Sequence, residues 1–210
     1  MNLRLAVFAS GRGSNFKAIL DAVQAGTLDA KVVLLISDQQ EAGALQTAAQ
    51  AGIPAKIIMP NAFATSEDYG KALLQALAEC DSNFIVLAGF LRMIPAAVVK
   101  AFSGHIINIH PALLPGFGGK GMYGRRVHQA VLDYGCKVSG ATVHLVDENY
   151  DTGKPLVQRC APVYEDDTPE SLAARVLEIE HQILPETLQL FAKDRVKIDD
   201  QRVRILPIEF

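Results

Sequence analysis

The chain has 210 residues, of which 50% are hydrophobic and 20% are charged, and its formal net charge is −3. This composition predicts one globular domain over residues 1–210, and the negative charge argues against a protein that binds nucleic acid through bulk electrostatics. No apolar run approaches the ~18 residues of a membrane span, and the short apolar N-terminal stretch is not a signal peptide. Three cysteines without a Cys-x-x-Cys spacing exclude a disulfide framework and a zinc ribbon, and they predict a cytoplasmic protein.

Strand-like and helix-like segments alternate through the first half of the chain. Runs of β-branched and other apolar residues have the length of strands, and Gly or Pro residues separate them from segments with helical spacing. Continuous apolar strands that alternate with helices are typical of an α/β fold, with a doubly wound, mainly parallel sheet and helices on both faces. The predicted strands are residues 3–9, 31–36, 55–59, 84–88 and 105–109, and the predicted helices are residues 14–24, 43–51, 66–79 and 95–102.

The second half of the chain has a different character. Residues 111–124 contain five glycines and predict a long loop, because so many glycines disfavour regular structure. After the loop, the pattern predicts a helix, two strands that form an antiparallel pair at the sheet edge, a long helix, and a small hairpin that turns at Asp199 and Asp200. In that order, these elements are residues 125–134, 137–146, 156–163, 169–191 and 196–205.

A glycine-rich turn follows the first predicted strand and leads into the first helix. Residues 10–15 read Ser-Gly-Arg-Gly-Ser-Asn, which suits an anion, since glycines let the backbone approach a phosphate and the free N–H groups of a helix start favour negative charge. Phe16 stands where a dinucleotide fingerprint would need its third glycine, and no Gly-Lys-Ser/Thr follows as in a P-loop. A phosphate site and a tight turn with a capping serine are the two alternatives.

Two polar side chains interrupt the last strand of the first half. Asn108 and His110 alternate with isoleucines and are followed by Pro111, so both point to the same side of the strand. A strand end beside a long loop is where a doubly wound sheet builds its site. The Asn amide can donate to a developing oxyanion and the His can move a proton, which indicates acyl-type chemistry. The alternative is a capped strand end with a surface histidine.

His144, Asp151 and Glu180 are weaker candidates when each is taken alone. His144 lies inside a predicted strand, which is typical of a buried histidine with satisfied hydrogen bonds, and Asp151 lies in a Tyr-Asp-Thr-Gly turn, where aspartate is common. With His110 these two could surround a metal, although their wide spacing does not require one. Glu180 borders the inward-facing apolar stripe of the long helix, so its spacing favours a position at the rim of the core.

Four segments stand in a characteristic order along the chain. They are Gly-Arg-Gly-Ser-Asn at 11–15, Ala-Gly-Phe-Leu-Arg-Met-Ile at 88–94, Asn-Ile-His-Pro-Ala-Leu-Leu-Pro at 108–115, and His-Leu-Val-Asp-Glu-Asn-Tyr-Asp-Thr-Gly at 144–153. Over roughly residues 1–195, the chain resembles the phosphoribosylglycinamide formyltransferases, the folate-dependent enzymes of purine biosynthesis. The Asn-x-His-Pro-x-Leu-Leu-Pro string with its distal Asp is specific to formyltetrahydrofolate hydrolases and transferases as a group, and the Gly-Ser-Asn loop narrows the resemblance to the ribonucleotide enzymes.

The resemblance implies roles for the ribonucleotide-binding and catalytic residues. The 5′-phosphate of the ribonucleotide would be held by Gly13, Ser14 and Asn15, and Glu180 would contact the ribonucleotide. This role for the glutamate replaces the rim position that spacing favours. The catalytic residues would be Asn108, His110 and Asp151, with His144 beside them.

The resemblance also implies a folate site. The cosubstrate would be 10-formyltetrahydrofolate, the formyl donor. The segment 91–94 would line its pocket largely through backbone groups, and the loop 147–151 would close over the pterin ring. The implied folate-binding residues are Leu91, Arg92, Met93, Ile94, Asn108, Asp147, Glu148, Asn149, Tyr150 and Asp151.

The implied reaction transfers the formyl group to the amine of 5′-phosphoribosylglycinamide and yields formylglycinamide ribonucleotide and tetrahydrofolate. Asn108 and protonated His110 would stabilise the oxyanion of the tetrahedral intermediate, while Asp151 would favour the charged imidazole and help to pass the proton to the leaving nitrogen. No metal is needed, because the formyl group is already activated on nitrogen. The implied partners are these two small molecules, without nucleic acid or membrane, and a homodimer is compatible with the resemblance.

Two features depart from the family pattern. Ser66 stands where some relatives carry a basic residue near the folate tail, which leaves the contact with the glutamate tail open. The stretch 116–124 is longer and richer in glycine than in the shorter members, and we expect it to form a mobile lid. Lys120, Arg125 and Arg126 could add positive charge to the site, and the alternative is that they are solvated surface charges.

Three other functions fit part of the sequence. The strongest alternative is 10-formyltetrahydrofolate hydrolase (deformylase), which shares the catalytic string but carries an added N-terminal domain, for which a first strand at residue 3 leaves no room. Methionyl-tRNA formyltransferase would need a further C-terminal domain and a basic surface for tRNA. A phosphate-sensing module would leave Asn108, His110 and Asp151 without a role.

Overall fold

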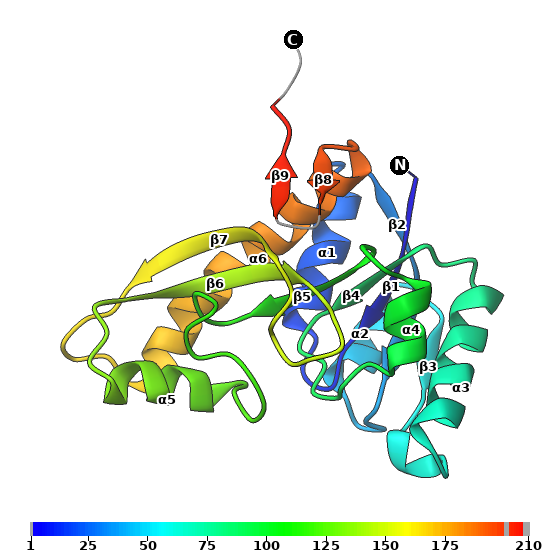
Figure 1. Cartoon of the computed structure of the whole chain (residues 1–210), viewed down its shortest axis with the longest axis horizontal. Coiled ribbons are helices and arrows are strands. Elements are labelled where there is room, and N and C mark those ends of the chain that lie inside the picture. Colours follow the sequence, from blue (N-terminus) through cyan, green and yellow to red (C-terminus); the bar gives the residue numbers. More distant parts are fainter. Residues whose placement is uncertain (1, 200–201, 208–210) are drawn as a thin grey trace.

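The computed structural model describes residues 2–199 and 202–207 of the chain. Its centre is a seven-stranded sheet with the strand order β3-β2-β1-β4-β5-β6-β7, flanked by helices (Figure 1). The strands are β1 (Leu3–Phe8), β2 (Ala30–Ser37), β3 (Ala55–Ile57), β4 (Phe84–Leu87), β5 (Ile106–His110), β6 (Val138–Leu145) and β7 (Pro155–Pro162).

Strands β1 to β5 pair in parallel, and β6 and β7 extend the sheet in antiparallel pairing next to β5. The predicted α/β fold, with a doubly wound, mainly parallel sheet and an antiparallel edge, is therefore confirmed. The chain runs outward from β1 to β3 and then returns to β4 on the other side of β1. At such a switch point the connections diverge, so ligands bind at the carboxyl ends of the strands on either side of it.

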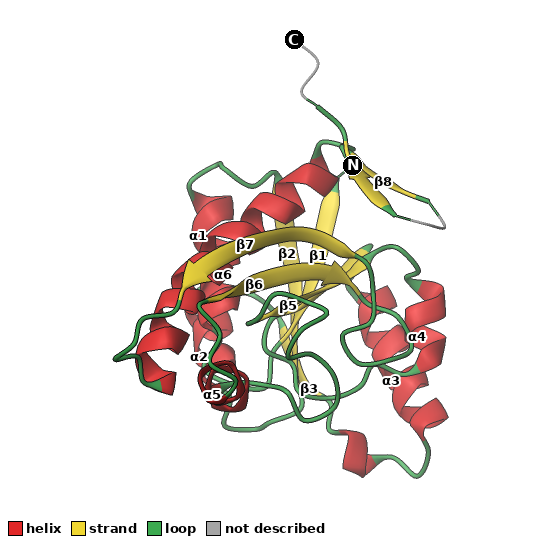
Figure 2. Ribbon diagram, turned by 60° about the vertical axis from the view of Figure 1, so that its left-hand side comes forward, coloured by secondary structure: helices red, strands yellow, loops and turns green. Residues whose placement is uncertain are grey.

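Helices cover both faces of the sheet, as predicted (Figure 2). One face is packed against α1, α2, α5 and α6, and the other against α3 and α4. The helices are α1 (Ser14–Gln24), α2 (Gly43–Gln50), η1 (Pro60–Ala62, a single 3-10 turn), α3 (Ser66–Glu79), α4 (Ala96–Ala101), α5 (Arg125–Asp133) and α6 (Pro169–Ala192).

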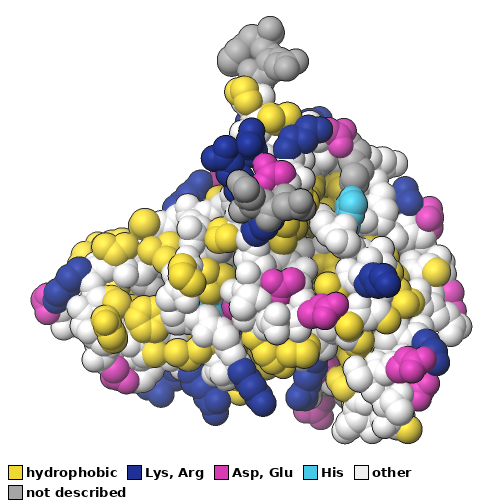
Figure 3. Space-filling view, viewed as in Figure 1, with side chains coloured by type: hydrophobic (Ala, Val, Ile, Leu, Met, Phe, Trp, Pro, Cys, Tyr) yellow, Lys and Arg dark blue, Asp and Glu magenta, His cyan; other side chains and the backbone are white. Residues whose placement is uncertain are grey.

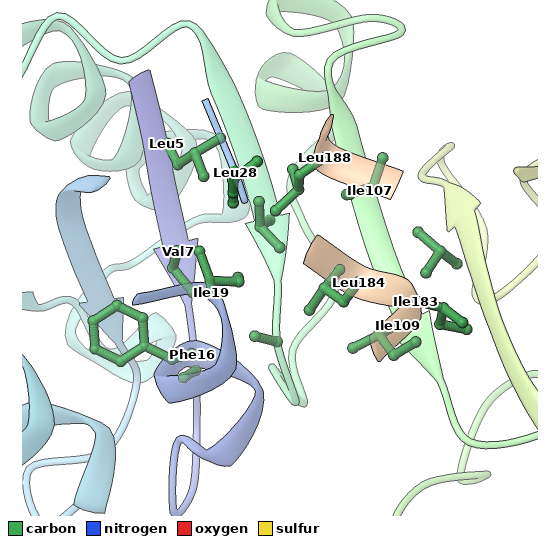
Figure 4. Close-up of a cluster of buried hydrophobic side chains, with 14 of the residues drawn as sticks. Leu5, Val7, Phe16, Ile19, Leu28, Ile107, Ile109, Ile183, Leu184 and Leu188 are labelled. Carbon is green, nitrogen blue, oxygen red and sulfur yellow. The ribbon is translucent and has the colours of Figure 1, made fainter. Parts of the chain in front are cut away.

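Two core clusters follow from the alternation of side chains along the strands. In β1, Leu5 and Val7 point into one cluster, and Ala6 and Phe8 point into the other. Helices cover both clusters, so all four side chains are buried and the strand is a continuous apolar run. Figure 4 shows the first cluster, in which side chains of α1 and α6 pack over β1 and β5.

Predicted and observed boundaries agree to within one or two residues. Strand β5 includes His110, which pairs with Thr142 of β6, and it ends there because Pro111 has no N–H for the ladder. The predicted C-terminal hairpin is present as β8 (Val196–Ile198) and β9 (Val203–Ile205), while Asp200 of its predicted turn lies outside the described residues. Within the described part of the chain, no helix is long and apolar enough to cross a membrane.

A buried hydroxyl holds the start of the long loop against the sheet. The side chain of Thr142 on β6 is fully buried, and its Oγ1 donates to the carbonyl of Ala112 at 2.7 Å and accepts from the N–H of Leu114 at 3.1 Å. Gln158 on β7 donates to the same oxygen at 3.0 Å. These bonds replace the ladder pairing that the loop backbone loses beyond β5.

We expect Thr142→Val to lower the free energy of unfolding by about 2–3 kcal/mol, because it keeps the side-chain shape but leaves a buried N–H and a buried carbonyl without this partner. Thr187→Val is the matched control. Thr187 is equally buried, but its hydroxyl donates to the Ile183 carbonyl inside α6, which the helix backbone already uses, so its loss should stay below about 1 kcal/mol. Urea unfolding measures both variants, and equal losses would contradict the role given to Thr142.

Candidate active site

A cavity of about 700 Å³ lies at the carboxyl ends of β1, β4 and β5. Its volume is in the range of small-molecule sites in proteins. The turns after β1 and β4, the end of β5, the loop before α5 and one side of α6 form its walls. The lining residues are 11–15, 88–91, 108–111, 119–126 and 150–151, with His128, Pro169, Glu170, Ala173, Leu177 and Glu180.

The glycine-rich turn after β1 forms one part of this cavity. Gly13 has a φ of 80°, and a Cβ atom there would come within 2.7 Å of Ala44, so the position requires glycine. Gly13 is also the N-cap of α1, and no side chain caps this helix start, so the alternative of a capping serine is wrong. The first N–H groups of α1, at Ser14 and Asn15, are therefore available to an anion.

Glu180 of α6 is buried beside this turn. Its carboxylate accepts a hydrogen bond from Nδ2 of Asn15 at 2.6 Å. Burial raises the pKa of Glu180 to about 7, although the bond from Asn15 acts in the opposite direction. Only 8% of Glu180 is exposed, so the rim position that spacing favoured is wrong. The reason is that both α1 and α5 pack against α6 and cover the border of its apolar stripe.

Asn108 and His110 lie on the same side of β5, as the alternation predicted, and both approach Asp151. Nδ2 of Asn108 lies 3.0 Å from Nε2 of His144, its pairing partner on β6, and 3.4 Å from Oδ1 of Asp151. The structure thus brings together all four side chains for which a catalytic role was predicted. The amide of Asn108 is held in place by two acceptors.

His144 combines two of the roles considered for it. It is 2% exposed, and its Nδ1 lies 2.7 Å from the carbonyl of Leu145, so Nδ1 carries a hydrogen and donates it. Nε2 then accepts from Asn108. His144 is therefore a buried, satisfied histidine that also orients the amide of Asn108.

Asp151 lies in the turn between β6 and β7, with a φ of 55°. Its Oδ2 accepts from the N–H of Gly119 at 2.9 Å and lies 3.6 Å from Nδ1 of His110, and its Oδ1 lies 3.6 Å from Nε2 of His144. Burial tends to raise the pKa of this carboxyl, but the two imidazoles and the Gly119 N–H outweigh burial and lower the pKa. Asp151 is therefore ionised at neutral pH.

Burial favours the neutral form of His110. The ring is 3% exposed, and Nε2 donates to the carbonyl of Phe117 at 2.9 Å. Burial lowers the pKa of His110, and the charge of Asp151 only partly compensates. This differs from the expectation that Asp151 keeps the ring protonated. The buried ring loses more hydration free energy than one carboxylate at 3.6 Å restores.

The glycine-rich loop before α5 closes one side of the cluster. Through the Phe117 carbonyl and the Gly119 N–H it binds His110 and Asp151. A Cβ atom on Gly118 would come within 2.5 Å of the Leu114 side chain and 3.2 Å of the Asp151 Cβ, so glycine at this position lets the loop approach. The loop contributes backbone groups to the site, and its motion as a lid stays a prediction.

The segment 91–94, predicted to bind folate, is divided between the cavity and the core. Leu91 lines the cavity. Ile94 is 4% exposed and packs in the second core cluster, while the side chain of Met93 is exposed. A ligand contact at Ile94 would therefore have to use its backbone.

The second predicted folate segment, 147–151, is a turn that Asp147 holds in shape. The Asp147 carboxylate accepts from the N–H of Asn149 at 2.9 Å and from the hydroxyl of Thr152 at 2.7 Å. Tyr150 lines the cavity beside Asp151, whereas Asp147, Glu148 and Asn149 do not line it. The turn thus presents its last two residues to the cavity.

Arg92 lines a smaller side cavity of about 570 Å³, together with Asp38. The two cavities share the residues Gly11, Arg12, Leu91 and Tyr123. Asp38 was missed by sequence reasoning. The available signal was its position directly after the buried strand β2, where a polar residue reaches the same edge of the sheet as Asn108 and His110.

His128 was also missed. It lies on α5, is 3% exposed and lines the main cavity, and its Nδ1 has no hydrogen-bond partner among the described residues. Burial, with a smaller contribution from His110, lowers the pKa of His128 to about 4. Its spacing from Val127 and Val131 marks the buried face of the helix, but no local pattern shows that this face meets the cavity.

Cationic side chains line part of the main cavity. Arg125 is paired with Glu170, and the guanidinium of Arg126 lies 5.2 Å from the centroid of the Tyr123 ring. Figure 3 shows Lys and Arg side chains gathered along the lower edge of the molecule, near α5 and the loop before it. The cationic lining residues, Arg12, Lys120, Arg125 and Arg126, favour anionic ligands. In residues 2–199 and 202–207, no group of three or more His, Cys, Asp or Glu is arranged to hold a metal ion.

The chain is similar to known formyl transferases. A family model described as formyl transferase matches residues 3–188. A chloroplastic phosphoribosylglycinamide formyltransferase from Vigna unguiculata is 45% identical over 92% of this chain, which spans 62% of that protein's length. The crystal structure of glycinamide ribonucleotide transformylase 1 from Symbiobacterium toebii is 38% identical, with a TM-score of 0.93 over 98% of this chain and 95% of that one. The crystal structure of a formyltetrahydrofolate deformylase from Pseudomonas syringae is 22% identical, with a TM-score of 0.88. The match covers 99% of this chain and 67% of the deformylase chain, and at this identity it shows only that the two proteins share a fold.

We expect Glu180→Gln to stabilise the chain at pH 8 and to have little effect at pH 5. The pKa of the buried carboxyl is about 7 instead of 4.5, so between these values the native state holds a proton that the unfolded state releases. Stability therefore falls as the pH rises through this window. Glutamine removes this loss, which is on the order of 3 kcal/mol at pH 8.

Urea unfolding of wild type and variant at both pH values measures this difference. Glu178→Gln, on the exposed side of the same helix, is the matched control and should change stability equally at both pH values. A Glu180→Gln effect that does not grow between pH 5 and pH 8 would show that the Glu180 carboxyl titrates normally.

Proposed function

The chain belongs to the formyl transferase family, within the phosphoribosylglycinamide formyltransferases, and we propose that it catalyses their reaction. It would transfer the formyl group of 10-formyltetrahydrofolate to the amine of 5′-phosphoribosylglycinamide in de novo purine biosynthesis. The products would be formylglycinamide ribonucleotide and tetrahydrofolate. One observation carries the proposal. An uncapped, glycine-led helix start and the cluster of Asn108, His110 and Asp151 line the same cavity.

The ribonucleotide phosphate would bind at the start of α1. The N–H groups of Ser14 and Asn15 and the positive end of the helix dipole suit its charge, and Gly13 lets the phosphate come close. Glu180 would accept hydrogen bonds from the rest of the ribonucleotide. The buried Oδ1 of Asn15 has no partner among the described residues and is a further acceptor beside Glu180.

Asn108 and His110 would stabilise the formyl oxygen during transfer. When the amine attacks, a carbon–nitrogen bond forms and negative charge develops on that oxygen. Nδ2 of Asn108 is a neutral donor whose orientation is set by the 3.0 Å contact with His144. Its second hydrogen makes only a long bond of 3.4 Å to Asp151 and would turn from this carboxylate to the formyl oxygen. The developing charge also raises the pKa of His110, so the ring, neutral at rest, can hold a proton in the transition state.

Asp151 would move the proton that the reaction must transfer. The attacking nitrogen becomes positive and has to lose a proton, while the leaving nitrogen has to gain one as its bond to the formyl carbon breaks. An ionised carboxylate is the acceptor that this step needs, and Asp151 can pass the proton on through His110, 3.6 Å away, or through water. Protons and charge then balance without a further reactant.

The formyl donor is the second substrate, and the residues present fit its chemistry. Leu91 contributes an apolar side chain and Tyr150 an aromatic side chain to the wall of the main cavity. This cavity, of about 700 Å³, shares lining residues with the side cavity of about 570 Å³. This combined volume suits two substrates that meet at Asn108. The proposal also comprises one formyltransferase domain over residues 1–210, a cytoplasmic protein, and small-molecule partners rather than nucleic acid or membrane. A homodimer is compatible with it.

Product analysis tests the proposed function directly. The protein, ribonucleotide and formyl donor are incubated together, and the products are separated by chromatography. We expect formylglycinamide ribonucleotide and tetrahydrofolate in equal amounts. Free formate with unchanged ribonucleotide would identify a deformylase, and no turnover of the donor would contradict a formyl-transfer function altogether.

We expect Asp151→Asn to lower kcat by about 10²–10⁴, the usual range for a general acid–base group. The amide keeps an acceptor for the Gly119 N–H but loses the charge that accepts the proton and that raises the pKa of His110. Affinity for the ribonucleotide should survive, because Ser14 and Asn15 are untouched. Steady-state kinetics and a separate binding titration measure the two effects.

Asp133→Asn, at an exposed position near the end of α5, is the matched control and should leave both quantities unchanged. Near-normal turnover by a folded Asp151→Asn variant would remove Asp151 from the proposed mechanism.

A further inference from the structure

Asp38 is a buried carboxylate that the reaction chemistry does not use. It directly follows β2, and its side chain is fully buried, whereas its partner Arg92 is about half exposed. Oδ2 of Asp38 accepts from Nε of Arg92 at 2.7 Å and from Nε2 of Gln39 at 3.0 Å. A charged pair therefore stands at the inner end of the side cavity, apart from the cluster around Asp151.

This carboxylate is only partly satisfied. Its Oδ1 is buried without a hydrogen-bond partner among the described residues, and so is the hydroxyl of Tyr69 nearby. Burial tends to raise the pKa of Asp38, yet Ser10, Arg92 and Gln39 together lower it, so the group is charged. A partly satisfied buried charge contributes little net stability, and an apolar side chain of similar volume would serve the core as well. The role of Asp38 is therefore sought in the side chains that it contacts, Arg92 above all.

Asp38 contacts one corner of the cavity wall, which is the turn of residues 89–92 after β4. The Ser10 hydroxyl, which lies beside Asp38, accepts from the N–H of Leu91 at 2.9 Å, and the Ser10 N–H donates to the carbonyl of Gly89 at 3.1 Å. Arg92 is held by Asp38 itself. The corner 89–92 is thus tied to the ends of β1 and β2, and Leu91 in this corner lines both cavities.

The pairing also leaves part of Arg92 available. Asp38 engages Nε, while the two terminal nitrogens of the guanidinium have no partner among residues 2–199 and 202–207. Arg92 lines the side cavity, as does Arg12. A guanidinium fixed through Nε keeps its two terminal N–H groups in a preset direction, which suits a planar anion such as a carboxylate.

We propose that Asp38 is a positioning residue for the formyl donor: it fixes the Leu91 wall and presents Arg92 to an anionic part of a pteridine substrate. The proposal rests on the proposed function, since it names the residue that prepares the donor side of that site. Asp38 does not touch the reacting atoms, and it meets the glycine-rich turn only at Ser10, ahead of the N–H groups of Ser14 and Asn15. Its loss should therefore weaken donor binding and leave the chemical step intact.

Asp38→Asn keeps the shape of the side chain and removes its charge. We expect the KM for 10-formyltetrahydrofolate and the Kd for tetrahydrofolate, measured by isothermal titration calorimetry, each to rise about tenfold. The kcat and the KM for the ribonucleotide should stay within about twofold. A fall in kcat with unchanged donor KM and unchanged Kd would overturn the proposal, because a general structural defect would give that result.

Arg92→Gln tests the same contact from the exposed partner. It leaves the buried Asp38 carboxylate without its cation, so circular dichroism first establishes that the variant is folded. We expect it to reproduce the tenfold rise, and the double variant should be no worse than either single variant, because both remove one interaction. Effects that multiply in the double variant, or a normal Kd for tetrahydrofolate in Arg92→Gln, would contradict a role for Asp38 through Arg92.

Asp167→Asn is the matched control. Its carboxylate is 2% exposed and paired with Arg175, but it lines neither cavity, so it should lose stability without a change in donor affinity. Failure of the two proposals can be told apart. A wild-type protein without formyl transfer contradicts the proposed function, whereas an active wild type whose Asp38 and Arg92 variants bind the donor normally contradicts this inference alone.

Discussion

The carboxylate of Asp151 is largely withdrawn from solvent, with 12% of the side chain exposed, and such a charge needs donors within the protein. The N–H of Gly119 in the long loop and the amide of Asn108 on β5 supply them, and Nδ1 of His110 lies 3.6 Å away. Since an unpaired buried charge costs several kcal/mol, the strands and the loop have to meet at this point when the chain folds. The small residue at Gly118 and the left-handed backbone at Asp151 both serve that close approach.

The same desolvation acts on each titratable group of the cavity with a different outcome. Asp151 has enough donors to stay ionised, His110 loses its charge, and Glu180, with one donor, is raised to a pKa of about 7. An ionised acceptor therefore stands beside a neutral imidazole, which is the separation that proton transfer at neutral pH requires. In the proposed mechanism, negative charge on the formyl oxygen raises the pKa of His110 and so favours its protonated form in the transition state.

Strand order explains why these groups lie together. The switch between β1 and β4 places the turn after β1, the corner after β4 and the end of β5 around one cavity. Asp38 belongs to the same edge, because β2 ends there as well. The fold thus places the uncapped helix start and Leu91 on the cavity that Asn108 also lines, with Arg92 on the side cavity.

The order of strands and helices and the shared side of Asn108 and His110 could be predicted from the amino-acid pattern, because apolar runs and a period of two are local properties of the chain. The pattern also marked the helix start at Gly13, since positive φ and close approach select glycine. The burial of Glu180, the lowered pKa of His110 and the positions of Asp38 and His128 in the cavity walls come from the packing of the whole chain. Those properties depend on desolvation and on contacts between residues far apart along the chain, such as Asn15 and Glu180, and no local pattern encodes the packing of α1 and α5 against α6.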